Sequence, residues 1–386
     1  MYALFFCANV YKLCKKWLTL QCMNIMGKSI PLPMLFIPMR KILQLLFCFL
    51  ALTFAMQVLA EDRKLQMHAV AFYNLENLFD TCHDEGKNDW DYLPEGTYNW
   101  SGKKYRHKLA NMARVLSELG TDKLPYGSCI IGVCEVENSA VLDALVAQPK
   151  IKKRGYKYVH IEGPDKRGID CALIYNPRVF KVIKAFNKDY IYENGDTSRR
   201  TRPYLCVQGK LDDENLTVVV CHWPSRSSES IFREYAGRQV RALTDSISEA
   251  DPSQHIIVMG DMNDDPDDAS MAQHLGAKRH CAEVGKGDFY NPWWEVLRSK
   301  EQGTLRYQGI WNHFDQIVLG RSLMEEYESE EHSTLTLHSY HIFKRDYLFQ
   351  SKGRYKGSPK RTFSREVWLD GYSDHLPVVV YLSKSN

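Results

Sequence analysis

Short apolar runs, each ended or preceded by a polar residue, recur along this 386-residue chain and constrain its fold most strongly. The polar residues are carboxylates, amides and histidines, and the segments that carry them are AFYNLEN, IIGVCEVEN, VVVCHWPSR, IIVMGDMND, FDQIVLG and YSDHLPVVVY. Apolar runs of about four to eight residues are typical of buried strands. Because strand ends are where α/β folds gather chemistry from distant parts of a sequence, we expect these polar side chains to meet.

The apolar pattern predicts strands mixed with helices. We expect strands at His68–Tyr73, Cys129–Cys134, Tyr156–Ile161, Asp170–Tyr175, Tyr204–Leu211, Leu216–Cys221, His255–Met259, Gln316–Leu319 and Pro377–Leu382. Apolar residues recurring every three or four positions predict helices at Lys104–Leu119, Ala140–Leu145 and Ser230–Glu249. Some consecutive strands are close enough for hairpins and others are separated by a helix. This mixture favours mixed sheets covered by helices, an α/β fold.

Residues 61–386 contain no repeat, low-complexity tract or linker, so we expect a single domain there. Two segments look inserted. Phe289–Trp294 is aromatic, and Tyr340–Phe363 alternates aromatic with basic residues. Each is either an irregular surface loop or a rim that faces substrate, where rings stack and cations meet phosphates.

Residues 39–60 have the layout of a secretory signal peptide. Arg40 and Lys41 precede the apolar run Ile42–Met56, and small residues follow up to Ala60. The alternative is an uncleaved anchor, although the charge-free stretch barely reaches spanning length. We expect export to the periplasm or beyond, no stable membrane insertion after cleavage, and an upstream extension at 1–38 that precedes the true start.

The net charge of the chain changes sign when this leader is left out. The formal charge is +3, but the first sixty residues hold six basic residues and no acid, which leaves 44 basic against 47 acidic residues. A mildly acidic body is not typical of proteins that coat nucleic acid by charge alone. Phosphate binding must therefore be local, through a metal ion or a few arginines and lysines.

The segment Gly260-Asp261-Met262-Asn263 follows an apolar run. Residues 261 and 263 present their side chains on the same side of an extended backbone, where a carboxylate and an amide can hold a water or a phosphate oxygen near a hard cation. A calcium loop is the rival interpretation. It fails because Pro266 and Ala272 occupy the positions that require Gly and Glu.

Ser373-Asp374-His375 stands directly before the last apolar run. Adjacent residues of a strand point to opposite faces, so Asp374 and His375 are expected to serve different partners. His375 suits a phosphate, with Asp315 hydrogen-bonded to it, fixing its tautomer and raising its pKa. Asp374 suits a metal shell. His222 ends another apolar run, where a lone histidine is as often structural as functional.

Glu135 ends the apolar stretch Ile130–Cys134, where a buried carboxylate needs a cation or several donors. Glu137 is the nearby alternative to Glu135. Asn74 is preferred over Glu76 because it directly follows the apolar run Val70–Tyr73. Hard oxygen ligands without a Cys/His cluster favour Mg²⁺, or Mn²⁺, over zinc. The motifs of serine hydrolases, P-loop proteins, dinucleotide-binding proteins and zinc proteases are absent from the sequence.

In this order the motifs resemble those of the endonuclease/exonuclease/phosphatase superfamily, the fold of pancreatic deoxyribonuclease. The resemblance runs from about Val70 to Tyr381, and G-D-x-N and S-D-H-x-P are its most specific parts. It implies a four-layered α-β-β-α sandwich with two mixed, mostly antiparallel sheets packed face to face. The site is then expected at one edge of the sheets.

The resemblance also implies roles for individual residues. Glu135, Asn74 and Asp374 correspond to metal-side positions, whereas Asp261 and Asn263 position the attacking water and the phosphate. His375, oriented by Asp315, corresponds to the histidine at the scissile phosphate. His222 is similar to a second histidine that assists the leaving group. Candidate phosphate anchors are Arg202, Arg226 and Arg167, each of which is equally well a surface arginine.

These roles predict in-line attack of water on a phosphorus ester with Mg²⁺ as cofactor. The expected function is an exported phosphodiesterase, a nuclease acting on extracellular nucleic acid as a monomer. Two alternatives remain open: a phosphatase of inositol or sugar phosphates, and a catalytically silent binding protein with the same fold. Basic DNA-binding loops and a long hydrophobic hairpin are both missing, and Trp293-Trp294 is the one candidate for membrane contact.

Overall fold

The computed structural model describes residues 65–193, 195–196, 198–299, 302–324 and 334–385. All of them fall in one compact unit, Arg63–Asn386. The predicted signal peptide and upstream extension lie outside the described residues. Among the described helices, none combines the length and the apolar character that crossing a membrane requires.

The first sheet has six strands, and its neighbours are antiparallel except for β1 and β2, which are parallel. Its spatial order is β14 (Thr336–Ile342), β17 (Val378–Ser385), β1 (Leu65–Leu78), β2 (Ile130–Val136), β4 (Asp170–Tyr175) and β3 (Lys157–His160). The long strand β1 is central: it pairs with β17 over Leu65–Phe72 and with β2 from Val70 onward. Apolar side chains cover both of its faces.

The second sheet has seven strands, of which only β7 with β8 and β10 with β9 are parallel neighbours. Its order is β5 (Phe180–Lys188), β6 (Tyr204–Leu211), β7 (Glu214–His222), β8 (His255–Asp261), β13 (Asp315–Gly320), β10 (Phe289–Tyr290) and β9 (Ala277–Lys278). Both sheets are therefore mixed and mostly antiparallel, as predicted.

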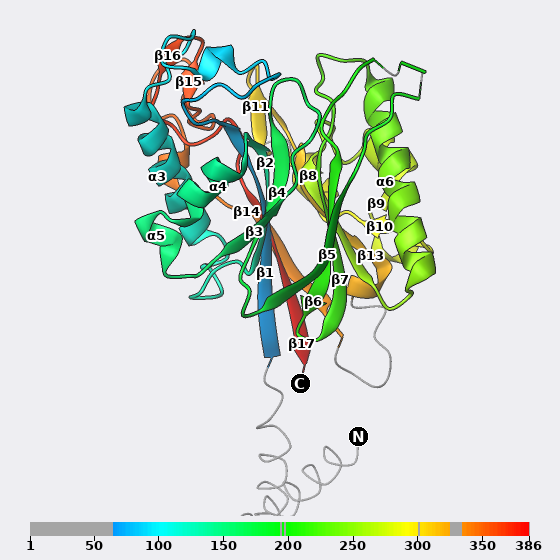
Figure 1. The fold of residues 1–386 in the computed structure, drawn as a ribbon. Coiled ribbons are helices and arrows are strands. Elements are labelled where there is room, and N and C mark those ends of the chain that lie inside the picture. Colours follow the sequence, from blue (N-terminus) through cyan, green and yellow to red (C-terminus); the bar gives the residue numbers. More distant parts are fainter. Residues whose placement is uncertain (1–64, 194, 197, 300–301, 325–333, 386) are drawn as a thin grey trace, which may run out of the picture. The chain divides into compact units, whose positions relative to one another are not determined.

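Helices cover the outer face of each sheet (Figure 1). On one side lie α3 (Gly102–Glu118), α4 (Ser139–Val146) and α5 (Pro149–Lys152); on the other lie α6 (Ser230–Ala250) and the π-helical turn η2 (Ser270–Leu275). Short elements complete the described chain: α7 (Trp294–Arg298), the hairpins β11 (Leu305–Tyr307) with β12 (Ile310–Asn312) and β15 (Phe363–Ser364) with β16 (Val367–Trp368), and the turns η1 (Trp90–Tyr92), η3 (Cys281–Glu283), η4 (Arg321–Leu323) and η6 (Asp346–Leu348). These layers form the predicted four-layered sandwich.

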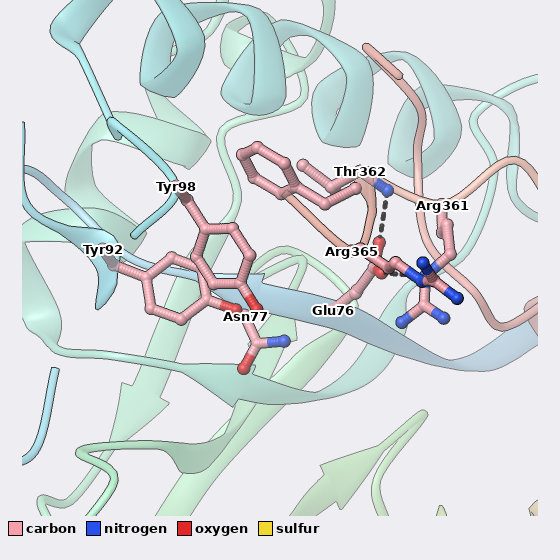
Figure 2. A pocket seen from close by; sticks show the side chains of 8 residues that line it. Glu76, Asn77, Tyr92, Tyr98, Arg361, Thr362 and Arg365 are labelled. Carbon is pink, nitrogen blue, oxygen red and sulfur yellow. Dashed lines mark hydrogen bonds and ion pairs between the residues drawn. The ribbon is translucent and has the colours of Figure 1, made fainter. Parts of the chain in front are cut away.

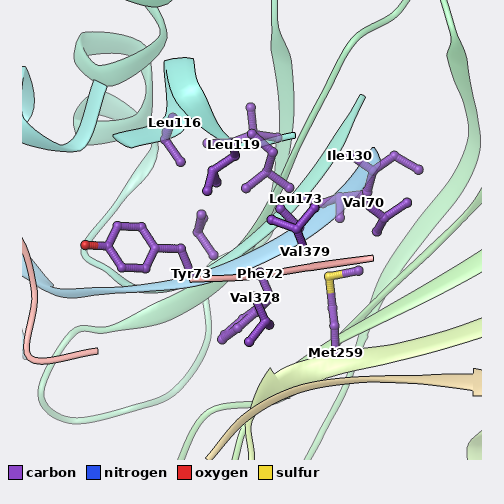
Figure 3. Packing of buried hydrophobic residues seen from close by; sticks show 14 of the residues in the cluster. Val70, Phe72, Tyr73, Leu116, Leu119, Ile130, Leu173, Met259, Val378 and Val379 are labelled. Carbon is purple, nitrogen blue, oxygen red and sulfur yellow. The ribbon is translucent and has the colours of Figure 1, made fainter. Parts of the chain in front are cut away.

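The principal core fills the space between the two sheets and continues on the outer face of the first sheet beneath α3, where Leu116 and Leu119 lie (Figure 3). Met259 on β8 reaches across to Phe72 and Gly132 of the first sheet. A Cβ at Gly132 would overlap the Met259 sulfur, so glycine allows the sheets to approach closely here. This tight packing fixes the two sheets relative to one another, and with them the polar residues at their edge.

Each predicted strand coincides with an observed one. The strands that were not predicted are the two- and three-residue strands β9 to β12, β15 and β16, and the longer strands β5 and β14. Both lie at the edge of a sheet. In β5, Lys181, Lys184 and Lys188 interrupt the apolar alternation, and β14 has the polar sequence Thr-Leu-His-Ser-Tyr-His-Ile. Edge strands expose one side to water and often carry charge that prevents further pairing, so their apolar signal is weak.

The expectation of an inserted surface loop at Phe289–Trp294 is wrong. Phe289 is buried in β10 and pairs with Gly320 of β13, and Trp293 is fully buried with its Nε1 donating to the Ile317 carbonyl at 2.9 Å. The aromatic cluster is core, so Trp293 has no surface for membrane contact. Tyr340, the start of the second supposed insertion, is likewise part of a sheet, in β14.

Candidate active site

The strand order explains why the polar residues meet at one edge. Because β7 and β8 are parallel, their carboxyl ends coincide, and His222 lies beside Asp261. Strand β13 runs antiparallel to β8, so its first residue, Asp315, pairs with Asp261 from the other side. In the first sheet the parallel pair β1 and β2 brings Asn74 next to Cys134, directly before Glu135.

Asp261 occupies the middle of this group. Its Oδ2 accepts a hydrogen bond from Asn74 Nδ2 at 3.0 Å and lies 3.7 Å from both His222 Nε2 and His375 Nε2. Its Oδ1 accepts from the Asn263 backbone N–H at 3.0 Å. Burial raises the pKa of Asp261 to about 7, against the lowering effect of His375. The carboxyl group can therefore both accept and release a proton near neutral pH.

His375 is held by the carboxylate behind it. Its Nδ1 donates to Asp315 Oδ2 at 2.6 Å, and its backbone N–H donates to Ser373 Oγ at 3.0 Å. Burial alone would lower the pKa of His375, but Asp315 and Asp261 together raise it well above its ordinary value of 6.5. His375 is thus an imidazolium whose Nε2 faces Asp261.

His222 has no such support. Its Nε2 lies 3.8 Å from Glu135 Oε1, and its buried Nδ1 has no hydrogen-bond partner among the described residues. Burial, followed by the charges of Arg202 and Arg167, lowers its pKa well below 6.5. His222 is therefore neutral at physiological pH. Its Nε2 faces two carboxylates, which favours the tautomer with the proton on Nε2.

Glu135 reaches the group because β2 is irregular at this point. The register of β2 against both neighbours shifts after Cys134, and Glu135 itself has a positive φ of 60°. A left-handed non-glycine residue at a bulge is a costly conformation that is most common at functional sites. The Asn77 backbone N–H donates to Glu135 Oε2 at 2.9 Å. Glu137, its competitor from the sequence, instead accepts from the Asp80 N–H at 2.6 Å, outside the group.

Asn74 joins the two carboxylates. Its Oδ1 accepts from the Glu76 N–H at 2.9 Å, which sets the amide orientation. Its Nδ2 consequently faces Asp261 and, at 3.5 Å, Glu135 Oε1. In this orientation Asn74 offers a hydrogen-bond donor to the centre, suited to a phosphate oxygen, and the metal-side role expected for it stays a prediction.

Asp374 and Glu76 are bridged by Arg361, which the sequence analysis did not single out as a site residue. Arg361 Nη2 donates to Asp374 Oδ2 at 2.9 Å and its Nε donates to Glu76 Oε1 at 3.1 Å. Burial works to raise the pKa of Asp374, but Arg361 and His375 bring it below its ordinary value. Asp374 lies in a bend before β17, so strand alternation does not separate it from His375, whose Nε2 is 3.9 Å from Asp374 Oδ1.

The donor set fits a hard divalent cation. Asp261, Asp315 and His375 bring ligand atoms within 4.8 Å of one another. His375 and Asp315 are already bonded to each other, which leaves the Asp261 carboxylate of this set for an ion. Glu135 borders it through His222, whose Nε2 lies 3.8 Å from Glu135 Oε1 and 3.7 Å from Asp261 Oδ2, and Asp374 Oδ1 lies 3.9 Å from His375 Nε2. Such a concentration of buried acids needs compensating positive charge, and oxygen ligands suit Mg²⁺ or Mn²⁺.

Arg202 and Arg226, two of the three predicted phosphate anchors, lie beside this group but are bonded to other residues of the protein. Arg202 is buried and donates to Asp165 Oδ2 at 3.2 Å and to the Trp223 carbonyl at 2.9 Å. Arg226 donates to the Asn263 carbonyl, to Asn312 and to the carboxylates of Asp265 and Asp268. These contacts occupy donors that a phosphate would need, although the buried Nε of Arg202 has no partner among the described residues. Arg167 is half-exposed and lies 3.8 Å from Glu135 Oε2, at the border of the group.

Comparison with known proteins decides the family. The sequence profile of the endonuclease/exonuclease/phosphatase family matches residues 69–384. The chain belongs to this family. No protein of curated function matches its sequence significantly.

The solved structures to which this chain is similar include a phosphatase and a complex with DNA. A family protein from Bacteroides thetaiotaomicron is 16% identical with a TM-score of 0.50, covering 84% of this chain and 97% of its own. The mannosyl-6-phosphatase of the same species is also 16% identical with a TM-score of 0.50, over 82% and 99%. D. rerio TDP2 complexed with single-strand DNA product is 17% identical, with a TM-score of 0.47 over 82% and 99%. At these identities the likeness shows the fold alone.

A cavity of about 230 Å³ lies beside the group of polar residues around Asp261. Figure 2 shows Glu76 and Asn77 between two tyrosines on one side and two arginines on the other. Arg361 and Phe363 of this lining come from the segment Tyr340–Phe363, so one end of that segment does face the site. The sequence signal for it was the alternation of aromatic and basic residues.

Proposed function

We propose that this protein is an exported, Mg²⁺-dependent phosphodiesterase that acts on nucleic acid. The observation that carries the proposal is the arrangement around Asp261 Oδ2, on which one amide donor and two imidazoles in opposite charge states converge. A carboxyl group that titrates near neutrality, beside a fixed cation, suits hydrolysis of a phosphorus ester.

The protein side chains divide the work of in-line attack. Asp261, whose carboxylate is held by the Asn263 N–H, accepts the proton of the attacking water. The imidazolium of His375 lies where it neutralises charge that develops on the phosphoryl oxygens, and Asp315 keeps it oriented. His222 and Asn74 donate hydrogen bonds to the same group. Glu135, with Asp374, would hold Mg²⁺, which supplies further positive charge to the phosphate.

A phosphatase of small phosphorylated molecules is the second candidate. The feature that favours it is the cavity beside the centre, which has the size of a single ring-bearing group rather than of an extended strand. The acidic balance of residues 61–386 supports the same candidate, because it offers little non-specific attraction to a polyanion.

A substrate panel separates the two candidates. Purified protein and its His375→Ala variant would be incubated with single- and double-stranded DNA, RNA and a set of phosphomonoesters, with Mg²⁺ and with EDTA. Metal-dependent cleavage of polymers that the variant lacks supports the nuclease. Phosphate release from monoesters alone supports the phosphatase. Binding of substrate without turnover under every condition would contradict both and leave a silent binding protein.

We further propose that residues 39–60 direct export and are removed after Ala60. The basic start, the apolar run and the small residues at the cleavage point support this proposal. Amino-terminal sequencing of protein recovered from the extracytoplasmic fraction should begin at Glu61. Recovery of residues before Met39 in that mature protein would contradict both the cleavage and the proposed start.

A further inference from the structure

The cavity beside the centre has two chemically different walls, and we call it the Tyr–Arg pocket. It is lined by Tyr92, Tyr98, Arg361, Arg365, Glu76 and Asn77, together with parts of the chain next to Arg361. In Figure 2 the aromatic wall and the arginine wall face one another across Glu76 and Asn77. A ligand in the pocket would therefore meet rings on one side and guanidinium groups on the other.

The pocket is continuous with the catalytic group through the backbone of β1. Asn77, on its floor, lies three residues beyond Asn74, and its N–H donates to Glu135 Oε2 at 2.9 Å. From the cationic wall, Arg361 donates to Asp374 at 2.9 Å. A phosphate held at the centre thus has the pocket next to it, in reach of whatever group the phosphate carries.

The aromatic wall is fixed in place by stacking. Tyr92 stacks on Phe79 with ring centroids 4.4 Å apart and an interplanar angle of 10°. Tyr98 leans on Phe363 at 4.6 Å and on Tyr92 at 5.0 Å. Rings that are held this way lose little further freedom when they bind a planar base or the C–H face of a sugar, which favours binding.

The cationic wall carries positive charge that the one acid of the lining does not neutralise. Glu76, the one acid of the lining, is already compensated, because it accepts from Arg361 at 3.1 Å and from the Thr362 N–H at 2.6 Å and lies 3.9 Å from Lys108 Nζ. Arg365 is exposed and forms no hydrogen bond or ion pair with any other residue in the described part of the chain. Its guanidinium is available for an anion.

We propose that the Tyr–Arg pocket is the specificity pocket of this enzyme and that it takes a ring-bearing group carrying a second phosphate. The ring lies against Tyr92 and Tyr98, and Arg365 binds the second phosphate. The inference rests on the proposed function, because the first phosphate is the one hydrolysed at Asp261. A nucleoside bisphosphate at a strand end and a sugar bisphosphate share this chemistry.

Matched chromogenic probes test the pocket. The first is thymidine 5′-(p-nitrophenyl phosphate), the second is the same compound with a 3′-phosphate, and bis(p-nitrophenyl) phosphate reports basal turnover. With the unaltered protein and Mg²⁺, the 3′-phosphate should lower KM about fivefold, the size of one exposed charge-assisted contact. In Arg365→Gln that preference should vanish while turnover of bis(p-nitrophenyl) phosphate is unchanged.

Arg354→Gln is the matched control, because Arg354 is an exposed arginine of the same region that does not line the pocket. Its guanidinium carbon lies 5.8 Å from the centroid of the Tyr355 ring. It should keep the preference in full. Equal KM for both thymidine probes in the unaltered protein would overturn the proposal, as would an Arg365→Gln variant that retains the difference.

Inhibition experiments determine whether the ligand is a nucleoside bisphosphate or a sugar bisphosphate. Thymidine 3′,5′-bisphosphate and glucose 1,6-bisphosphate would each be compared with the corresponding monophosphate. Whichever bisphosphate inhibits more strongly than its monophosphate, in an Arg365-dependent way, supports the pocket and identifies the source. If neither bisphosphate is favoured, the proposal is contradicted.

Calorimetry distinguishes a failure of the pocket proposal from a failure of the proposed function. It would measure the binding of thymidine 3′,5′-bisphosphate to the unaltered protein and to Arg365→Gln. Binding that weakens about fivefold in the variant, in a protein that hydrolyses no probe, would uphold the pocket and refute the proposed function. Hydrolysis of bis(p-nitrophenyl) phosphate with no effect of the second phosphate on either KM or binding would refute the pocket and leave the function standing.

Discussion

Two histidines approach the same carboxylate oxygen from neighbouring regions of the site, and they are in opposite charge states. His375, before β17, and His222, at the end of β7, each place Nε2 3.7 Å from Asp261 Oδ2. Both are buried. Nevertheless, the pKa of His375 is well above 6.5 and that of His222 is well below it.

The difference comes from what lies behind each ring. His375 Nδ1 donates to the fully buried Asp315 at 2.6 Å, which returns more stabilisation to the imidazolium than burial removes. His222 Nδ1 has no partner among the described residues, and Arg202 and Arg167 add positive charge nearby. Equal distance to the reacting group therefore does not make two histidines equivalent; the second ring nitrogen decides the charge.

Removal of the charged histidine should have the largest effect. His375→Ala takes away the imidazolium beside Asp261, and kcat should fall by about three to four orders of magnitude. Turnover of bis(p-nitrophenyl) phosphate at saturating Mg²⁺ measures it, and circular dichroism controls for folding. A variant that keeps more than a tenth of the activity would remove His375 from the catalytic group.

Glu135→Gln should come next, because Glu135 is proposed to hold Mg²⁺ and lies beside His222, 3.8 Å from its Nε2. We expect a loss of about one hundredfold at limiting Mg²⁺, partly recovered at high concentration. A Mg²⁺ titration of turnover checks this expectation, with Glu137→Gln as the matched control. If the Glu137 variant shifts the titration instead, the metal role belongs to Glu137.

Asp315→Asn makes the environment of His375 resemble that of His222. The pKa of His375 should fall, so the imidazolium is lost at a lower pH and the alkaline limb of the kcat/KM profile moves downward. At neutral pH we expect a loss of about ten- to one hundredfold. The stabilisation from this pair is full below pH 6.5 and disappears as pH rises through the folded pKa, so the deficit in Tm should shrink in alkaline buffer.

His222→Gln should have the smallest effect of the four. Glutamine keeps an N–H donor near Asp261 and Glu135, so kcat should fall by about tenfold with little change in the pH profile. The pH dependence of kcat/KM provides the check. A shift of the acidic limb in this variant would mean that His222 titrates during catalysis, contrary to its low pKa.

Much of the fold and of the central group could be predicted from the sequence, because each residue directly follows a strand whose apolar pattern is visible locally. The runs before Asn74, Glu135 and Asp261 are buried strands with strong apolar signals, and their ends meet because parallel pairing aligns them. The hydrogen bond expected between Asp315 and His375 is present at 2.6 Å.

The remainder depends on partners that no local pattern reveals. Arg361 meets Glu76 across 285 positions of sequence, and it is placed by an irregular segment rather than by a strand. Arg202 follows a pattern that suits a phosphate anchor, yet Asp165 and the Trp223 carbonyl engage it inside the protein. Trp293 belongs to a segment with the composition of a surface rim but fills the core, because aromatic composition does not distinguish a rim from a core.

The central claim, that Asp315 keeps His375 charged while His222 stays neutral beside the same carboxylate, is tested most directly by histidine-selective ¹⁵N NMR over a pH titration. The full chain would be measured with and without Mg²⁺, and His375→Gln and His222→Gln would assign the two signals. We predict that His375 remains an imidazolium well above pH 6.5 and that His222 remains neutral well below it. A His375 that deprotonates at or below 6.5, or a His222 that becomes charged above it, would contradict this account.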